Sequence, residues 1–172
     1  MTRGPDGQLT LRFTGNRVLA VSDGSGAAGA KATLLLDGKP MEGVKELWAI
    51  TRPSVGPAKI WMPAINHVAF DRPPVEEDWT LTCLGDSTPD GKKIHFKLQG
   101  GVTGDDGEGW STDRFVSRSG RAILEPPDWR IAWTLGYRKA TLPEGFKVTW
   151  RSYPLFARSE ERRVGKECTI QC

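Results

Sequence analysis

Short runs in which apolar and polar residues alternate, interrupted at close intervals by glycine and proline, constrain this sequence most. The 172 residues include 20 glycines and 12 prolines, and their spacing leaves no segment with a long helical period. Alternation with a period of two gives a strand one side for a core and one for solvent. The pattern predicts about eight to ten strands at the spacing typical of a sandwich or barrel, and therefore an all-β fold.

The clearest predicted hairpin joins strands 79–83 and 94–99 through the turn-forming segment 85–91. Apolar and polar residues alternate in both strands, so one face of each strand is suited to a core. The apolar set comprises Trp79, Leu81, Cys83, Ile94, Phe96 and Leu98. We expect these side chains to be buried together.

Weaker strand patterns lie on both sides of this hairpin. They cover residues 9–13, 18–21, 32–36, 131–137 and 146–150. The third ends in Asp37-Gly38, a strong signal for a tight turn because glycine accepts a positive φ without steric cost. The last two are predicted to be joined through a turn over Leu142–Gly145.

The charge balance does not favour a nucleic-acid partner. The formal net charge is +3, from 24 basic and 21 acidic residues, whereas a nucleic-acid interface needs a clustered basic face. No apolar run approaches the length of a membrane span, and no signal peptide precedes Thr10. We therefore expect neither a nucleic-acid partner nor a membrane partner.

The last residues differ in character from the rest. The string Arg158–Cys168 resembles the in-frame translation of a short-read sequencing adapter, which implies a fragment from an environmental assembly. We expect a single domain over residues 1–157 and a non-native tail, extended or disordered, over residues 158–172. Without that tail the chain has 20 basic and 18 acidic residues, and Cys83 is its single cysteine. A lone cysteine predicts no disulfide framework.

The string Gly85-Asp-Ser87 matches the nucleophile motif of SGNH esterases, but its surroundings predict a hairpin tip. In those enzymes the serine begins a helix and needs a downstream Asp-x-x-His pair to accept its proton. Here a Thr-Pro-Asp-Gly turn and an alternating strand follow the serine, and His95 is the one downstream histidine. We therefore predict no catalytic residue in this chain.

Seven tryptophans are the first candidate binding feature. Aromatic faces stack on the apolar faces of sugar rings, although large aromatics also fill cores. Three tryptophans are in phase with apolar neighbours and are predicted core residues: Trp79, Trp133 and Trp150. Four flank turns, prolines or a polar loop and are the predicted surface or cleft set: Trp48, Trp61, Trp110 and Trp129. Arg17 and Arg52 are the predicted polar contacts beside such a cleft.

The predicted loop Gly100–Asp113 is the second candidate feature. It offers four hard oxygen ligands: Asp105, Asp106, Glu108 and Asp113. Such ligands suit Ca²⁺, the one cofactor that the sequence suggests, although the spacing departs from the helix–loop–helix pattern. An ordinary solvated acidic turn is the alternative. Asp106 is also a candidate ligand-binding residue, and with Glu108 it forms a candidate carboxylate pair for glycoside hydrolysis.

Turn-rich strings spread over residues 9–156 resemble the accessory β-sandwich domains of bacterial SGNH-type hydrolases. They are Leu11–Val18, Leu34–Lys39, Val102–Gly109, Phe115–Arg121 and Asp128-Trp129. The resemblance implies a jelly-roll-like antiparallel β-sandwich with long loops that binds a glycan. It also implies a partner, the catalytic domain of the same parent protein, and an extracellular or periplasmic location.

Three functions stay open on the sequence. The leading hypothesis is a non-catalytic, carbohydrate-associated β-sandwich module of a bacterial extracytoplasmic hydrolase. The second is a self-contained glycan-active hydrolase that uses loop carboxylates such as Asp106 and Glu108. The third is a purely structural domain that packs on a catalytic neighbour through an exposed apolar patch.

Overall fold

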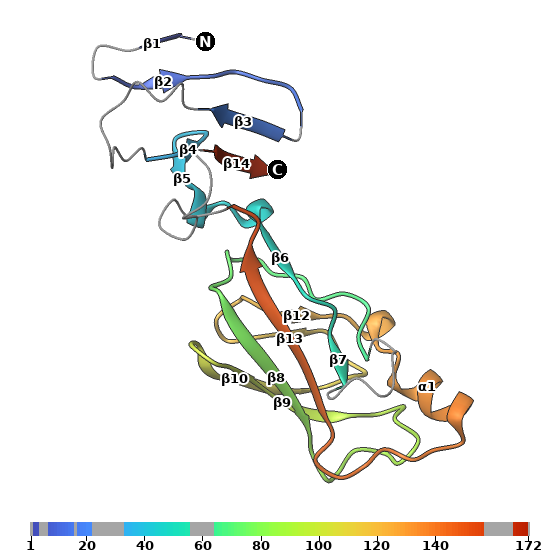
Figure 1. Cartoon of the computed structure of the whole chain (residues 1–172). Coiled ribbons are helices and arrows are strands. Elements are labelled where there is room, and N and C mark those ends of the chain that lie inside the picture. The colour runs from blue at the N-terminus through green and yellow to red at the C-terminus, as the bar shows by residue number, and fades with distance from the viewer. Residues whose placement is uncertain are drawn as a thin grey trace. The chain divides into compact units, whose positions relative to one another are not determined.

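A computed structural model of the chain describes residues 2–3, 7–15, 17–21, 33–55, 64–156 and 167–171, of which 2–3, 17–21 and 167–171 are described by their backbone. The chain divides into two compact units. Unit 1 comprises Met1–Thr33 and Leu155–Cys172, and unit 2 comprises Leu34–Pro154. The strands are antiparallel in both units, which confirms the predicted all-β fold (Figure 1).

Unit 1 contains two pairs of strands. β1 (Thr2–Arg3) pairs with β2 (Leu9–Thr10), and β3 (Arg17–Val21) pairs with β14 (Glu167–Gln171). The strand predicted over residues 18–21 is confirmed as β3. β14 lies in the segment predicted to be a non-native tail. The domain end predicted near residue 157 stays a prediction, because residues 157–166 are outside the described ranges.

The half-buried strand predicted over residues 9–13 is wrong beyond its first two residues. The strand ends at Thr10, and Leu9, Leu11 and Phe13 are all exposed. Alternation stabilises a strand when its apolar side meets a second layer. In the described part of unit 1 these three side chains are covered by no such layer.

A six-stranded antiparallel sheet forms the body of unit 2 (Figure 1). Its strands are, in spatial order, β10 (Gly104–Trp110), β9 (His95–Gly100), β8 (Glu77–Cys83), β13 (Lys147–Pro154) and β6 (Trp48–Ile50), with β7 (Ser54–Val55) also paired to β13. The predicted hairpin is confirmed as β8 and β9, with Leu81 opposite Leu98. The last strand of the unit, β13, therefore lies between strands from its earlier parts.

Short elements complete unit 2. They are β4 (Leu35–Leu36), β5 (Lys39–Pro40), η1 (Met41–Gly43), η2 (Lys45–Leu47), β11 (Phe115–Val116), β12 (Ile123–Leu124), η3 (Pro126–Asp128) and α1 (Ile131–Arg138). The predicted turn between β4 and β5 is confirmed, with positive φ at both Asp37 and Gly38. None of the helices in the described ranges has the length and apolar composition needed to cross a bilayer.

The core of unit 2 lies between the inner face of the sheet and a covering layer. The sheet contributes Trp79, Leu81, Cys83, Phe96, Leu98, Val148 and Trp150, and the cover contributes Ala64, Ile65, Val68, Phe115, Ala122, Leu124, Ile131 and Leu135. This arrangement is sandwich-like, as predicted. The jelly-roll connectivity stays a prediction.

Two of the predicted core tryptophans form the centre of this packing. Trp79 and Trp150 are directly opposite each other on β8 and β13, with ring centroids 6.1 Å apart and ring planes 13° from parallel. The indole Nε1 of Trp79 donates to the Ser152 hydroxyl at 3.1 Å, and that hydroxyl donates to the Val75 carbonyl at 2.6 Å. A polar atom in the core is thus satisfied, and its bonds also tie β13 to the segment before β8.

A buried carboxylate holds the turn between β9 and β10. Glu77 is buried at the start of β8. Its Oε2 accepts hydrogen bonds from the backbone N–H groups of Val102 and Thr103, both at 2.8 Å, and its Oε1 accepts one from the Thr103 hydroxyl at 2.6 Å. Bonds from three donors compensate the loss of water around the charge.

The helix α1 replaces the strand predicted over the same residues. Strand periodicity would place Ile131, Trp133, Leu135 and Tyr137 on one face, whereas a helix puts just the i, i+4 pair Ile131 and Leu135 on the core side. That pair closes over Gly91, where a Cβ atom would lie 2.9 Å from Leu135 Cδ1. The prediction that Trp133 is a core residue is therefore wrong, since its side chain is 59% exposed.

The strand β10 replaces most of the loop predicted over residues 100–113. It pairs with β9 along its length and contains a bulge between Asp105 and Gly107. Its glycines make room for the cover, because a Cβ at Gly109 would lie 2.7 Å from the ring of Phe115. The glycines that suggest a loop in the sequence thus allow a strand to lie close to an aromatic ring.

Trp79, a confirmed core residue, and Trp133, which is exposed against prediction, together give a direct test of the fold. We expect Trp79→Ala to lower the free energy of unfolding by about 3–5 kcal/mol, because it empties the centre of the core and leaves a buried hydroxyl without its donor. Trp133→Ala should change it by no more than about 0.5 kcal/mol, since the ring is mainly in solvent. Urea unfolding followed by circular dichroism measures both. Equal losses for the two variants would contradict this arrangement of the core.

Candidate functional site

The tryptophans predicted to form a surface or cleft set are not gathered in one place. Trp48 is buried, with its Nε1 donating to the Glu42 carbonyl at 3.3 Å. Trp129 packs against the core at 5.1 Å from the Phe96 ring, and its buried Nε1 has no acceptor among the described residues. Trp61 lies outside the described residues. None of these three side chains is therefore shown as a ring face available to a ligand.

The fourth member of this set, Trp110, lies in a polar cluster at the β9–β10 edge of the sheet. Its ring stacks on the His95 imidazole at a centroid distance of 4.4 Å, with the planes 11° from parallel. The Lys93 ammonium lies 4.4 Å from the ring centroid, within the range of a cation–π contact. The surface of Trp110 is thus engaged by neighbours from its own sheet.

His95 lies between two carboxylates in this cluster. Its Nδ1 is 2.8 Å from both carboxylate oxygens of Asp86, and its Nε2 is 3.9 Å from Oε2 of Glu108. The Ser87 hydroxyl accepts from the His95 backbone N–H at 3.0 Å and donates to the His95 carbonyl at 3.1 Å. The Gly-Asp-Ser string is therefore part of the predicted turn, with its serine bonded to main chain rather than to the imidazole.

The first two predicted calcium ligands have other partners. Asp105 accepts from Lys97 Nζ at 2.7 Å and lies 3.3 Å from Arg118 Nη1. The hydrogen bond from Lys97, followed by one from the backbone N–H of Gly107, lowers the pKa of the Asp105 carboxyl. Asp106 is 1% exposed and accepts from the backbone N–H and the hydroxyl of Ser119 at 2.8 and 2.7 Å. Both carboxylates are thus already compensated by the protein.

The other two predicted ligands, Glu108 and Asp113, are exposed on β10 and after it. Asp106 is buried while Glu108 lies beside His95, so the proposed hydrolytic pair occupies two different environments. Within the described ranges, no group of three or more histidine, cysteine, aspartate or glutamate side chains is placed to hold a metal ion.

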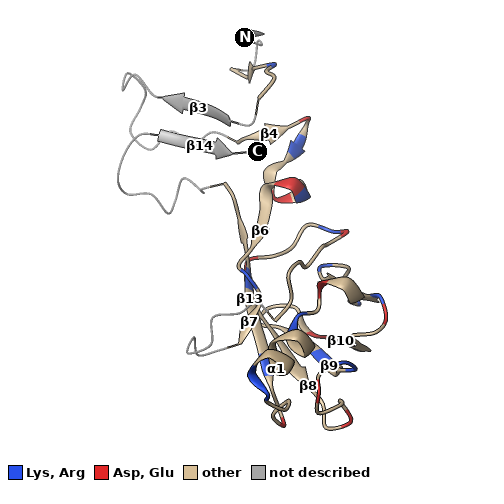
Figure 2. Cartoon of the chain, turned by 90° about the vertical axis from the view of Figure 1, so that its right-hand side faces the viewer, with Lys and Arg blue, Asp and Glu red and all other residues tan. Residues whose placement is uncertain are grey.

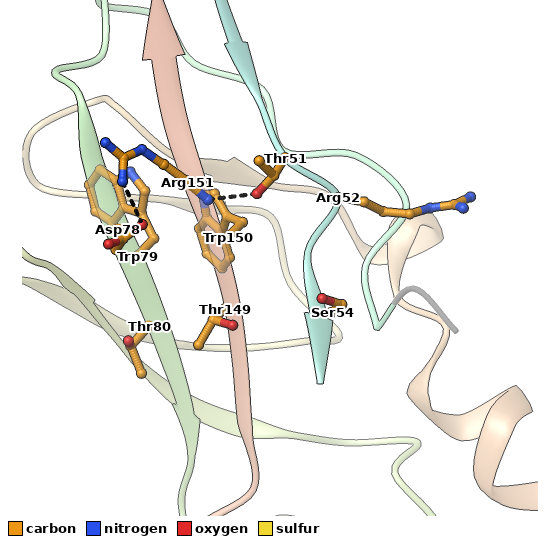
Figure 3. A pocket seen from close by; sticks show the side chains of 9 residues that line it. All are labelled: Thr51, Arg52, Ser54, Asp78, Trp79, Thr80, Thr149, Trp150 and Arg151. Carbon is orange, nitrogen blue, oxygen red and sulfur yellow. Dashed lines mark hydrogen bonds and ion pairs between the residues drawn. The ribbon is translucent and has the colours of Figure 1, made fainter. Parts of the chain in front are cut away.

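A shallow hollow of about 430 Å³ lies on the outer face of the sheet. It is lined by Thr51, Arg52, Ser54, Asp78, Trp79, Thr80, Thr149, Trp150 and Arg151 (Figure 3). The predicted contact Arg52 thus borders a hollow, although its side chain points away from the hydroxyl groups there (Figure 3). Trp79 and Trp150 are 1% and 4% exposed, so their rings belong to the core. The hollow offers hydrogen-bonding groups but no aromatic face. The side chain of Arg17 is not described.

Among the described residues of unit 2, the most exposed large aromatic side chains are on α1. Trp133 and Tyr137 are 59% and 77% exposed, and their rings are 5.8 Å apart and 10° from parallel. They are four residues apart, the spacing that brings side chains together on a helix. Burial of a large apolar side chain stabilises a fold by about 1.5–3 kcal/mol, and each of these two rings lacks most of that stabilisation because it lies in solvent. Exposed apolar surface of this kind marks interaction sites.

The position of these rings is fixed by the opposite face of α1. Ile131 and Leu135 are buried in the core beneath the helix. The helix ends at Arg138, and Lys139 caps it with a left-handed backbone (φ 53°). The Lys139 N–H donates to the Gly136 carbonyl at 3.3 Å, and the Ala140 N–H donates to the Leu135 carbonyl at 3.0 Å. The aromatic pair is therefore presented on a closed helical turn rather than on a loop.

Sequence reasoning missed this pair because the strand period concealed it. The signal was nevertheless present, since Ile131 and Leu135 form one i, i+4 pair and Trp133 and Tyr137 form another. Two interleaved i, i+4 pairs describe a short helix with one buried and one aromatic face as well as they describe a strand.

Comparison of the chain with protein-family models, with curated proteins and with solved structures found no match.

Cys83 is not available as a nucleophile in the folded protein. Burial raises the pKa of its thiol from 9.0 to about 12. The unfolded chain loses this proton first as the pH rises, so the stability contributed by the buried thiol is present below pH 9.0 and is lost between pH 9.0 and about 12.

We expect Cys83 to resist alkylation at pH 8 in the native state and to react once urea unfolds the chain. The measurement is the rate of iodoacetamide incorporation in a variant with Cys168→Ser and Cys172→Ser, which removes the other two thiols. Rapid labelling without denaturant would show that the thiol is accessible.

Proposed function

We propose that this chain is a non-catalytic, carbohydrate-associated module and that the Trp133–Tyr137 pair on α1 is its glycan-contacting surface. The observation that carries the proposal is the exposure of two nearly parallel aromatic rings on a helix anchored from below. One face of a pyranose ring carries C–H groups and is apolar, and an aromatic face is complementary to it. Because the rings are held in place before binding, little conformational entropy would be lost on association.

Polar neighbours would supply the hydrogen bonds that orient a sugar. Thr134 directly follows Trp133 in the sequence of α1. Its hydroxyl donates to the Arg130 carbonyl at 3.1 Å, so the lone pairs of the hydroxyl oxygen are left for a ligand hydroxyl. Arg138 follows Tyr137 directly and is exposed. By the resemblance to accessory domains, the parent protein would be an extracytoplasmic hydrolase with the catalytic groups in a neighbouring domain.

The same aromatic pair supports a second candidate function, docking on the catalytic neighbour. A structural domain needs an exposed apolar patch where its partner packs, and Trp133 with Tyr137 would provide one. A self-contained hydrolase is less well supported, because Asp106, one of its two proposed carboxylates, is buried and bonded to Ser119.

We expect soluble polysaccharides to change the tryptophan emission of the protein, because Trp133 is exposed while Trp79 and Trp150 are buried. Trp133→Ala and Tyr137→Ala should each weaken binding by about tenfold or more, since each removes half of the stacking surface. Trp110→Ala is the matched control, because it removes a partly exposed indole that is engaged by His95. It should leave affinity unchanged.

Titration over a panel of neutral and charged polysaccharides measures these affinities. No response across the panel would refute glycan binding and favour docking on a protein. Loss of binding in Trp110→Ala but not in Trp133→Ala would move the site to the β9–β10 edge.

A further inference from the structure

We infer that the aromatic surface on α1 takes an acidic polysaccharide, in which the sugar rings carry carboxylate or sulfate groups. The inference rests on the proposed function, because it assigns a chemical class to the same site. It depends on the basic residues that flank the two rings and on the absence of carboxylate partners for them among the described residues.

The segment that contains α1 has a positive balance between Asp128 and Glu144. Residues 129–143 contain three basic side chains, Arg130, Arg138 and Lys139, and no acidic one. Lysine and arginine positions accordingly lie at α1 in Figure 2. The local charge is therefore as large as the formal net charge of the whole chain, which is +3. A charge concentrated in this way raises the local concentration of anionic ligands.

The helix places Arg130 on the side of the rings, and Arg138 and Lys139 at its C-terminal end. Arg130 precedes Trp133 by three residues, so the two lie on the same side of the helix start. Arg138 directly follows Tyr137 in the chain and is exposed. Lys139 caps the helix with a left-handed backbone. A sugar stacked on the Trp133 ring would therefore lie on the side of the helix that carries Arg130.

The cations of α1 have no carboxylate partner among the described residues, in contrast to several others in unit 2. Lys97 pairs with Asp105, Arg114 with Glu125 and Arg151 with Glu76, at 2.7–2.9 Å. Arg130 is instead held by a neutral group. With the Asn66 amide turned so that its oxygen faces the guanidinium, Arg130 donates to it from Nε at 2.7 Å and from Nη2 at 3.0 Å.

Within the part of the chain that the structure describes, no carboxylate compensates the positive charge of this surface. An amide partner fixes the position of the Arg130 guanidinium without neutralising it. Binding an anion would then not require an internal ion pair to be broken first. A neutral glycan would gain from the rings alone, whereas an acidic one would gain from the rings and from the cations.

A single-stranded nucleic acid is the competing anionic ligand, and the site suits it less well. Single strands bind in a basic groove that follows several phosphates, with bases stacked on successive aromatic side chains. Here the cations of the surface lie within one helix of eight residues and its two flanking positions.

The test compares two ligands that differ in charge alone. Polygalacturonate and its fully methyl-esterified form share one backbone, and esterification removes the carboxylate charge. We expect the full chain to bind the acidic form about tenfold more tightly at low ionic strength, and the difference should shrink as salt is added. Dextran sulfate against dextran provides the same comparison for sulfate, and distinguishes the two sources of acidic groups.

Variants locate the effect on α1. Arg138→Gln with Lys139→Asn should lower affinity for the acidic ligand by about threefold to tenfold and leave affinity for its ester unchanged; asparagine tolerates the left-handed backbone at 139. Lys45→Gln, which removes an exposed charge from η2, is the matched control and should change neither. Trp133→Ala should weaken the binding of both ligands.

The outcomes separate the two proposals. Equal binding of the acid and ester forms, both lost in Trp133→Ala, would overturn the acidic specificity and retain glycan binding. Binding of neither form nor of either dextran would overturn glycan binding itself. Acidic binding that survives Trp133→Ala and the double variant would show adsorption elsewhere and overturn the inference. So would tighter binding of polyuridylate than of any acidic glycan.

Discussion

The pairing of β13 with β8 is the interaction on which unit 2 depends. It brings together strands that lie about seventy residues apart in the chain, an arrangement that carries a substantial cost in loop-closure entropy. The stacked Trp79 and Trp150 rings offset that cost with a large buried apolar area. The Ser152 hydroxyl adds hydrogen bonds between the same elements. Without this pairing, β13 with its partners β6 and β7 would be separated from β8, β9 and β10.

The two faces of the sheet differ in polarity. The inner face holds the apolar members of β8, β9 and β13, and the outer face holds their threonines and charged residues. The hollow beside Arg52 is a result of this division, since its aromatic residues face the core and its hydroxyls face solvent. The exposed aromatic pair among the described residues of unit 2 lies instead on α1, in the layer that covers the core.

The sequence predicted those parts of the structure in which local pattern and tertiary context agree. The hairpin of β8 and β9 is an example, because alternation and turn residues indicate the same register. It failed at α1, where apolar residues at every second position suit a strand and a short helix equally. It failed again at β10, where glycines that suggest a loop make space for Phe115. The packing of α1 depends on Gly91 and that of β10 depends on Phe115. Each of these residues lies outside the segment whose local period is read.

The candidate site followed the same division. Arg52 borders a hollow, but its role as a ligand contact stays a prediction. The tryptophans of the predicted surface or cleft set share proximity to turns, and such proximity does not determine exposure. Trp48 is buried although it follows a helical turn, and Trp133 is exposed although it lies in an apolar run. The burial of Asp106 beneath Ser119 likewise depends on the β10 bulge, which the sequence does not indicate.

The contact between α1 and Gly91 links the proposed ligand surface to the hairpin. The helix is attached through Ile131 and Leu135, which close over a residue in the connection between β8 and β9. A helix held by two buried side chains opens locally at a lower free energy than the sheet opens. A ligand that requires the closed helix shifts that local equilibrium, so its binding energy also protects the tip of the hairpin. Occupancy of the surface would thus be recorded in the slowed amide exchange of residues that never touch the ligand.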